Sequence, residues 1–224
     1  MNTSMMTAAE SLNTAVAGVL GRMMTGILAT MVVAGLLSAL GLAPVLFSGV
    51  LGWILVFAPL AISLYLAWRG DTMTVRSVQT WYFVFAGTMG VSLSLLFHVF
   101  TSASIVMALV GTTVSFGALA GWGYFTKRDI SNWGAFLFAG VIGLVVAGLL
   151  NIWLESSALQ MTLNVLTILI FLGLTAYDMN RIRDMFWSAS ASEIERMQWF
   201  GALSLYINFI NIFVSMLQLF GNRE

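Results

Sequence analysis

The chain has 224 residues, of which 60% are hydrophobic and only 8% are charged, and its formal net charge is zero. A soluble domain carries about 25% charged residues, so this composition excludes a domain that folds in water and predicts a polytopic membrane protein. Because cysteine is absent, disulfides and thiolate metal sites are excluded, and the zero net charge gives no basis for nucleic-acid binding.

Residues 1–21 are polar or weakly apolar and lack the basic segment that begins a cleaved signal peptide. We predict that they form a polar N-terminal tail ahead of a single transmembrane domain at 22–224. An apolar helix of about 20 residues crosses the hydrocarbon layer, where backbone polar groups must pair within the segment. The predicted fold is therefore an all-α bundle of seven spans, at residues 22–41, 45–67, 81–100, 104–125, 134–154, 162–180 and 200–220.

The basic residues fall at alternate ends of these spans. Only Arg223 lies on the far side, whereas the other eight of the nine basic residues share one side of the membrane: Arg22, Arg69, Arg76, Lys127, Arg128, Arg181, Arg183 and Arg196. Positive charge stays on the cytoplasmic side of membrane proteins. We therefore expect a cytoplasmic N-terminus and a C-terminus outside.

The last span carries a stripe of polar residues in an otherwise apolar helix. The residues follow one another in steps of four and three: Ser204, Asn208, Asn211, Ser215 and Gln218. This spacing places them on one face of a helix. A polar face in a spanning helix turns toward the bundle interior, where it pairs with other helices or lines a wet cavity.

The sixth span offers a matching polar face, with Asn164, Thr175 and Asp178 on one side. A carboxylate at the centre of a spanning helix costs roughly 3 kcal/mol on insertion scales, so Asp178 needs a partner. If the last two spans are neighbours, Asn208 lies at a depth where it can bond to Asp178. Arg69, at the end of the second span, is a cation within reach.

Plainer interpretations stay open for these residues. Asp178 can mark the start of a cytoplasmic loop in water, and the stripe can be glue between helices without a transport role. The segment "GALAG", residues 117–121, predicts a close helix contact. Because no paired aspartates, nucleophile triad or phosphate loop appear, we expect no enzymatic activity and no cofactor.

Three segments carry a family resemblance: "GYFTKRDISNWGAF", "ILIFLGLTAYDMNRIR" and "GALSLYINFINIFVSMLQLFGN". They resemble the bacterial branch of the Bax inhibitor-1 family, most strongly over residues 123–221. The resemblance implies a seven-helix fold whose last helix is central and wrapped by the others, a place in the bacterial inner membrane, and a leak of calcium that is gated by pH.

In that family, two intramembrane aspartates share a proton and form the pH sensor. The first matches Asp178, whereas Asn208 replaces the second, and Arg69 matches an arginine that latches the closed pore. Two close carboxylates cannot both ionise readily, and an amide removes that repulsion, so we predict altered pH gating. The pore-lining candidates are Ser204, Asn211, Ser215, Asn164 and Thr175.

Calcium prefers six to eight oxygen ligands, many of them charged, so Asp178 with neutral oxygens predicts only weak, transient calcium contact. This fits a leak better than a pump. The alternative is a non-conducting regulator that binds a membrane protease or another membrane protein, as some relatives are thought to do.

Overall fold

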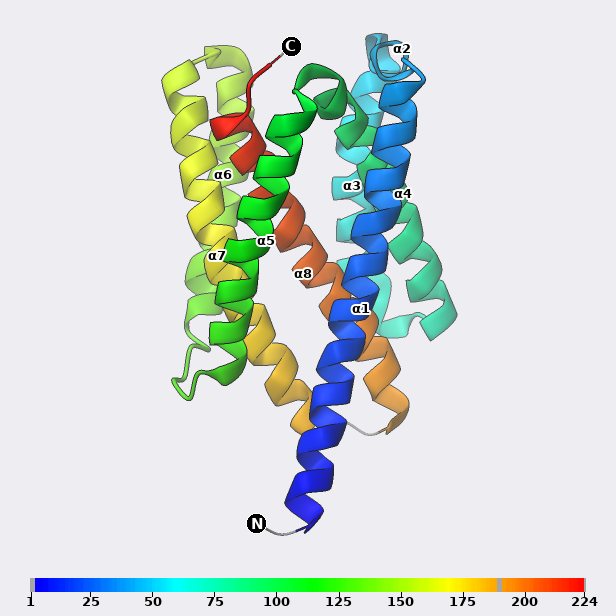
Figure 1. The fold of residues 1–224 in the computed structure, drawn as a ribbon, viewed down its shortest axis with the longest axis vertical. Coiled ribbons are helices and arrows are strands. Elements are labelled where there is room, and N and C mark those ends of the chain that lie inside the picture. The colour runs from blue at the N-terminus through cyan, green and yellow to red at the C-terminus, as the bar shows by residue number, and fades with distance from the viewer. Residues whose placement is uncertain (1–2, 189–190, 224) are drawn as a thin grey trace. The chain divides into compact units, whose positions relative to one another are not determined.

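The structure is a computed structural model that describes residues 3–188 and 191–223. Seven of its helices are long and apolar enough to cross a membrane. In chain order (Figure 1) the elements are α1 (Thr3–Ala39), α2 (Ala43–Leu46), α3 (Gly49–Arg69), the 3-10 helix η1 (Gly70–Thr72), α4 (Val75–Val99), α5 (Ser102–Phe125), α6 (Trp133–Leu154), α7 (Ser157–Ser188) and α8 (Ala191–Phe220). The all-α class and the seven predicted spans are confirmed.

Several helices extend well beyond the predicted spans. The span predicted at 162–180 belongs to the longer helix Ser157–Ser188, and the one predicted at 200–220 belongs to Ala191–Phe220. Hydropathy marks only the part of a helix that lies in hydrocarbon, whereas backbone hydrogen bonds carry the helix on through polar residues. In the same way, α1 begins at Thr3, so residues 3–21 continue into the first span; their separation as a tail stays a prediction.

The helices form two compact units, and α8 contributes to both. The first unit contains α1 to α4 and α8 up to Tyr206, and here α4 packs against α1 and α3. Tyr206 is fully buried, and its hydroxyl lies 2.6 Å from the hydroxyl of Thr30 on α1, which in turn donates to the carbonyl of Ala86 on α4. This chain of hydrogen bonds satisfies two buried hydroxyls and ties three helices together.

The second unit contains α5, α6, α7 and α8 from Ile207 onward. Here α7 packs against both α5 and α6. A Cβ built on Gly123 of α5 would collide with the backbone carbonyl of Ala176 on α7, so only glycine allows this approach. The close contact predicted at 117–121 is wrong within this unit: a Cβ on Gly117 or Gly121 would meet no atom of another part of the chain within 4 Å. A small-residue motif shows where helices can approach, but not which of its turns faces a neighbour.

Burial distinguishes α8 from the other spans. In its most apolar stretch 67% of the residues are buried, compared with 6% in α6. A helix that is apolar around most of its surface and also buried is a core helix, whereas an exposed apolar helix faces lipid. This agrees with the prediction that the last span is the central one.

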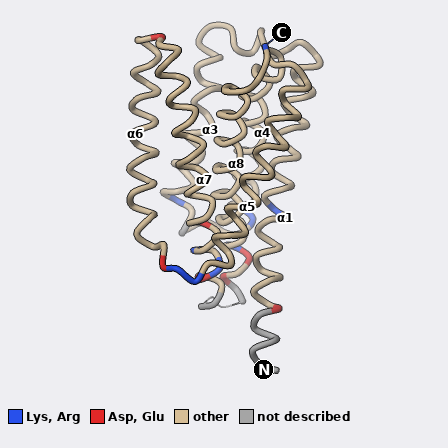
Figure 2. Tube along the Cα trace, turned by 60° about the vertical axis from the view of Figure 1, so that its left-hand side comes forward, with Lys and Arg blue, Asp and Glu red and all other residues tan. Residues whose placement is uncertain are grey.

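Charge is concentrated at one end of the second unit. In Figure 2 the loop between α5 and α6 is coloured blue, followed by a short red segment that belongs to the same loop, ahead of α6. The same end carries Arg181 and Arg183 near the end of α7. The opposite end of α6 leads into the turn that holds Glu155. The membrane orientation that we predict from such charges stays a prediction.

Candidate functional site: a carboxylate–amide pair between α7 and α8

The predicted contact between Asp178 and Asn208 is present. The side-chain Nδ2 of Asn208 donates to Oδ2 of Asp178 at 2.8 Å. Both residues belong to the second unit. Asn208 is only 3% exposed and Asp178 is half-buried. A charge-assisted hydrogen bond of this length is among the stronger polar interactions available to a buried amide.

Asp178 lies inside a helix and not at the start of a loop. α7 continues for ten residues beyond it, to Ser188, so the plainer interpretation of Asp178 as the first loop residue is wrong. At 1.5 Å per residue, Asp178 is roughly 32 Å along α7 from Ser157. Since the hydrocarbon layer is ~30 Å thick, the carboxylate lies close to its edge, where a partly hydrated charge can be tolerated.

Two of the predicted pore-lining residues bond within their own helices. The hydroxyl of Thr175 donates to the carbonyl of Phe171 at 2.7 Å, and the amide of Asn211 donates to the carbonyl of Ile207 at 2.8 Å. Such bonds satisfy a polar side chain without a partner helix. Ser215 is buried in the second unit, and Ser204 is half-buried in the first. A role for any of them in a pore stays a prediction.

Arg69 is the last residue of α3 and is exposed in the first unit. A cation at this position interacts favourably with the negative end of the helix dipole. The aspartate and the asparagine belong to the second unit, so a latch between Arg69 and this pair stays a prediction.

A second polar cluster in the same unit was predicted only in part: Asn164 and Gln218 belong to the predicted polar faces, whereas Asn151 and Gln160 were missed. The amide of Gln160 donates to Oδ1 of Asn164 at 3.2 Å and to Oε1 of Gln218 at 3.3 Å, and it accepts from Asn151 at 3.2 Å. These four amides join α6, α7 and α8 at the end opposite Asp178. The signal was present, because Gln160 lies four residues before Asn164 on the same helical face, but Gln160 fell outside the predicted span.

Two side chains of α7 cap the end of α5. Arg183 donates from Nη1 to the carbonyls of Tyr124 and Thr126, both at 2.8 Å, and its guanidinium also forms a 2.8 Å ion pair with Asp184. Asn180 donates to the carbonyl of Gly123 at 3.2 Å. The last carbonyls of a helix have no partner within it, so these bonds fix α5 against α7 just beyond Asp178.

Among the described residues, no three His, Asp or Glu side chains lie close enough to hold a metal ion. One partner of the Asp178 carboxylate is the side-chain amide of Asn208. The chemistry available at the pair is therefore one negative charge, held by an amide donor and placed at the edge of the apolar layer.

Seven apolar helices and a carboxylate held between two of them define a multi-pass membrane protein with an ionisable site. Comparison with known proteins identifies the family to which the chain belongs. The sequence profile described as "Inhibitor of apoptosis-promoting Bax1" matches residues 12–224. The chain belongs to the Bax inhibitor-1 family, as the resemblance predicted.

Relatives come from several bacteria. The uncharacterized protein RP147 of Rickettsia prowazekii is 36% identical over 174 residues, which cover 77% of this chain and 74% of the relative. The inner membrane protein YbhL of Escherichia coli K12 is 36% identical over 173 residues, or 76% and 74% of the two chains. An uncharacterized protein of Caulobacter vibrioides is 38% identical over 174 residues, or 76% and 70%. The relation to YbhL, together with the seven apolar helices, agrees with the predicted place in the bacterial inner membrane.

Proposed function

We propose that this protein is a calcium leak channel gated around Asp178, and that Asn208 gives it a pH response different from that of relatives with two aspartates. The observation that carries the proposal is the 2.8 Å hydrogen bond from Asn208 to Asp178. It leaves one carboxylate, and not two, at the contact between α7 and α8.

The hydrogen bond supports a gate for an electrostatic reason. A negative charge at the edge of the apolar layer attracts a cation from water, but a single carboxylate with neutral oxygens binds calcium only weakly. Weak binding lets an ion leave again, as conduction requires. Opening then means that α7 and α8 separate, which exposes the carboxylate and the buried amide to water.

The membership in the Bax inhibitor-1 family adds support, because the resemblance of the segment "TAYD" implies that Asp178 is the family's aspartate in the sixth span. We propose that the chain acts as a passive leak and is not an enzyme. Its transported species would be calcium, with no bound cofactor.

Flux measurement tests the proposal. The full chain is purified and reconstituted into liposomes that contain a calcium-sensitive dye, and calcium is added outside. We expect entry of calcium well above that of empty liposomes, and Asp178→Ala to abolish or deregulate it. Asp184→Ala is the matched control, since this exposed carboxylate pairs with Arg183 and not with α8.

Liposomes that show no calcium entry, from a protein that remains folded, would contradict the leak. If a membrane protease then co-purifies with the protein, the result favours the alternative, a non-conducting regulator.

A further inference from the structure

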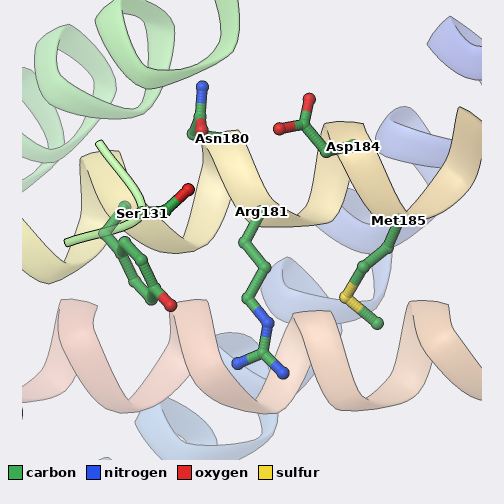
Figure 3. Close-up of a pocket in the computed structure, with 6 residues that line it drawn as sticks. Ser131, Asn180, Arg181, Asp184 and Met185 are labelled. Carbon is green, nitrogen blue, oxygen red and sulfur yellow. The ribbon is translucent and has the colours of Figure 1, made fainter. Parts of the chain in front are cut away.

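The second unit has a pocket that the proposed leak does not use. It has a volume of about 340 Å³ and lies between α7 and the loop that joins α5 to α6. Figure 3 shows Ser131 on that loop, opposite side chains of α7. The lining residues are Ser131, Tyr177, Asn180, Arg181, Asp184 and Met185.

The length of α7 places this pocket at the level of lipid headgroups. α7 has 32 residues, or roughly 48 Å at 1.5 Å per residue, whereas the hydrocarbon layer is only ~30 Å thick. Its last turns, from Arg181 onward, therefore lie beyond the acyl chains. Trp122 and Trp133, at the facing ends of α5 and α6, stack with ring centroids 5.8 Å apart and are both exposed. Indole rings prefer the membrane interface, which gives the same depth.

The charge around the pocket is positive on balance. The basic groups on the two elements are Lys127, Arg128, Arg181 and Arg183, and the acidic groups are Asp129, Asp178 and Asp184. Most of the acidic groups are already engaged: Asp184 pairs with Arg183, and Asp178 accepts from Asn208.

Asp129 accepts from the backbone N–H of Ser131 at 2.9 Å. The Ser131 hydroxyl and backbone hydrogen bonds hold the pKa of Asp129 below its ordinary value, so this residue keeps its negative charge. Within the part of the chain that the structure describes, Lys127, Arg128 and Arg181 have no ion-pair partner. These two elements therefore carry three exposed cations without an ion pair, compared with one acidic group, Asp129, that bonds within the loop.

The pocket wall also supplies a neutral donor, the hydroxyl of Tyr177. Asn180 is not such a donor, because in Figure 3 its amide lies on the side of α7 opposite to the Arg181 side chain, where it donates to the carbonyl of Gly123. Tyr177 brings a hydroxyl group and packs beside Gly134: a Cβ at residue 134 would lie 2.6 Å from the Tyr177 hydroxyl, so the ring would have to shift. A guanidinium with a hydroxyl donor on the same side of the helix suits a phosphate group.

The surface next to the pocket suits acyl chains. Phe125, at the end of α5, and Phe136, in the first turn of α6, are each 78% exposed. The exposed face of α6 continues this apolar surface away from the pocket. A free phosphate ion would gain nothing from it, whereas a phospholipid would bury both its headgroup and its chains.

We propose that this pocket binds the phosphate headgroup of an anionic phospholipid, with Arg181 as the main cation and the acyl chains lying along α6. Basic pockets between spanning helices are recognised sites for anionic headgroups. The site is separate from the carboxylate–amide pair and does not depend on whether the chain conducts calcium.

Native mass spectrometry of the purified, delipidated full chain tests this proposal. The probes are phosphatidylglycerol, phosphatidylcholine with the same acyl chains, and inorganic phosphate. We expect phosphatidylglycerol to bind more tightly than phosphatidylcholine, and Arg181→Gln to weaken the binding of phosphatidylglycerol about tenfold, the effect of losing one charge-assisted hydrogen bond. Arg76→Gln, which changes an exposed arginine of the first unit, should leave binding unchanged.

A second variant, Tyr177→Phe, should weaken phosphatidylglycerol binding less than Arg181→Gln does while it keeps the aromatic wall. Equal binding of the two lipids, or equal effects of the Arg181 and Arg76 variants, would overturn the proposal. Displacement of phosphatidylglycerol by millimolar inorganic phosphate would also overturn it, because the site would then recognise phosphate without a lipid.

Discussion

Asp178 and Asn208 each interrupt an apolar helix surface, and each meets the polar group of the other. The amide donates to the carboxylate at 2.8 Å, and the amide side chain is almost completely buried. Asn211, one turn further along the same helix, instead donates to the carbonyl of Ile207 in its own helix. Two asparagines three residues apart therefore have different structural roles, one between helices and one within a helix.

This difference predicts a difference in stability. Asn208→Leu removes the hydrogen bond that Asn208 donates to Asp178 on the neighbouring helix, so the free energy of unfolding should fall by about 1–2 kcal/mol. Asn211→Leu removes only a bond within the helix and adds apolar surface, so it should change stability by less than half as much. Unfolding in mixed micelles, followed by circular dichroism, measures both values. An equal decrease in the free energy of unfolding for the two variants would show that the interhelical bond stabilises the fold no more than the bond within the helix.

The helices α5 and α7 approach most closely at Gly123, where the backbone of Ala176 leaves no room for a side chain. Gly123→Ala should lower the free energy of unfolding by about 1–3 kcal/mol, because the collision is with backbone and cannot be relieved by a side-chain rotation. Gly121→Ala is the matched control. Its new methyl group would meet no atom within 4 Å, and alanine favours a helix over glycine by up to about 1 kcal/mol.

Thermal unfolding in detergent compares these two variants, with opposite signs expected. A Gly123→Ala protein as stable as the original chain would mean that α5 and α7 do not approach in this way in the membrane.

The end of α5 depends on Arg183, whose guanidinium holds two carbonyls of the last turn and the following loop. Arg183→Lys keeps the charge but cannot reproduce the planar fork. Losing one charge-assisted bond should speed amide exchange in the loop over residues 126–132 by roughly tenfold. Arg128→Lys, on the loop itself and with no such bond, is the control. Hydrogen–deuterium exchange with mass spectrometry measures the exchange rates of the loop in both variants. An unchanged rate in the Arg183 variant would exclude the capping role.

At the scale of elements, the sequence predicts what polarity and spacing encode. The seven spans, the polar face of the last helix and the contact of Asn208 with Asp178 all follow from polar residues in apolar helices. Arg183 capping α5 could not be predicted, because the carbonyls that it binds have no signature in the sequence. The close approach at Gly123 was also missed, since glycine spacing does not specify which helix will lie opposite.

For the molecule as a whole, the positions of the basic residues predict an orientation in the membrane, which the helices alone do not. One end of the second unit carries four basic residues, Lys127, Arg128, Arg181 and Arg183. The turn between α6 and α7, at residues 155–156, contains no basic residue. From the positive-inside rule we therefore predict that this turn lies outside the cytoplasm and that the α5–α6 loop lies inside.

The absence of cysteine makes this orientation directly testable. Ser157→Cys, in the exposed first residue of α7, should react with a membrane-impermeant maleimide in spheroplasts. Arg128→Cys, in the α5–α6 loop, should react only after the membrane is permeabilised. The reverse pattern of labelling would show that the membrane orientation is opposite to the predicted one.

The pH dependence of calcium entry into liposomes tests the proposed gate most directly. We compare the original chain with Asn208→Asp at mildly acidic and mildly basic pH, with Asn211→Asp as a control for an added carboxylate on the same helix. Two carboxylates at the distance of the Asp178–Asn208 bond cannot both ionise readily and must share a proton. We predict that the flux of the Asn208→Asp protein changes with pH much more than that of the original chain, which keeps one charge throughout. Identical pH profiles for the two proteins would contradict a gate built on this pair.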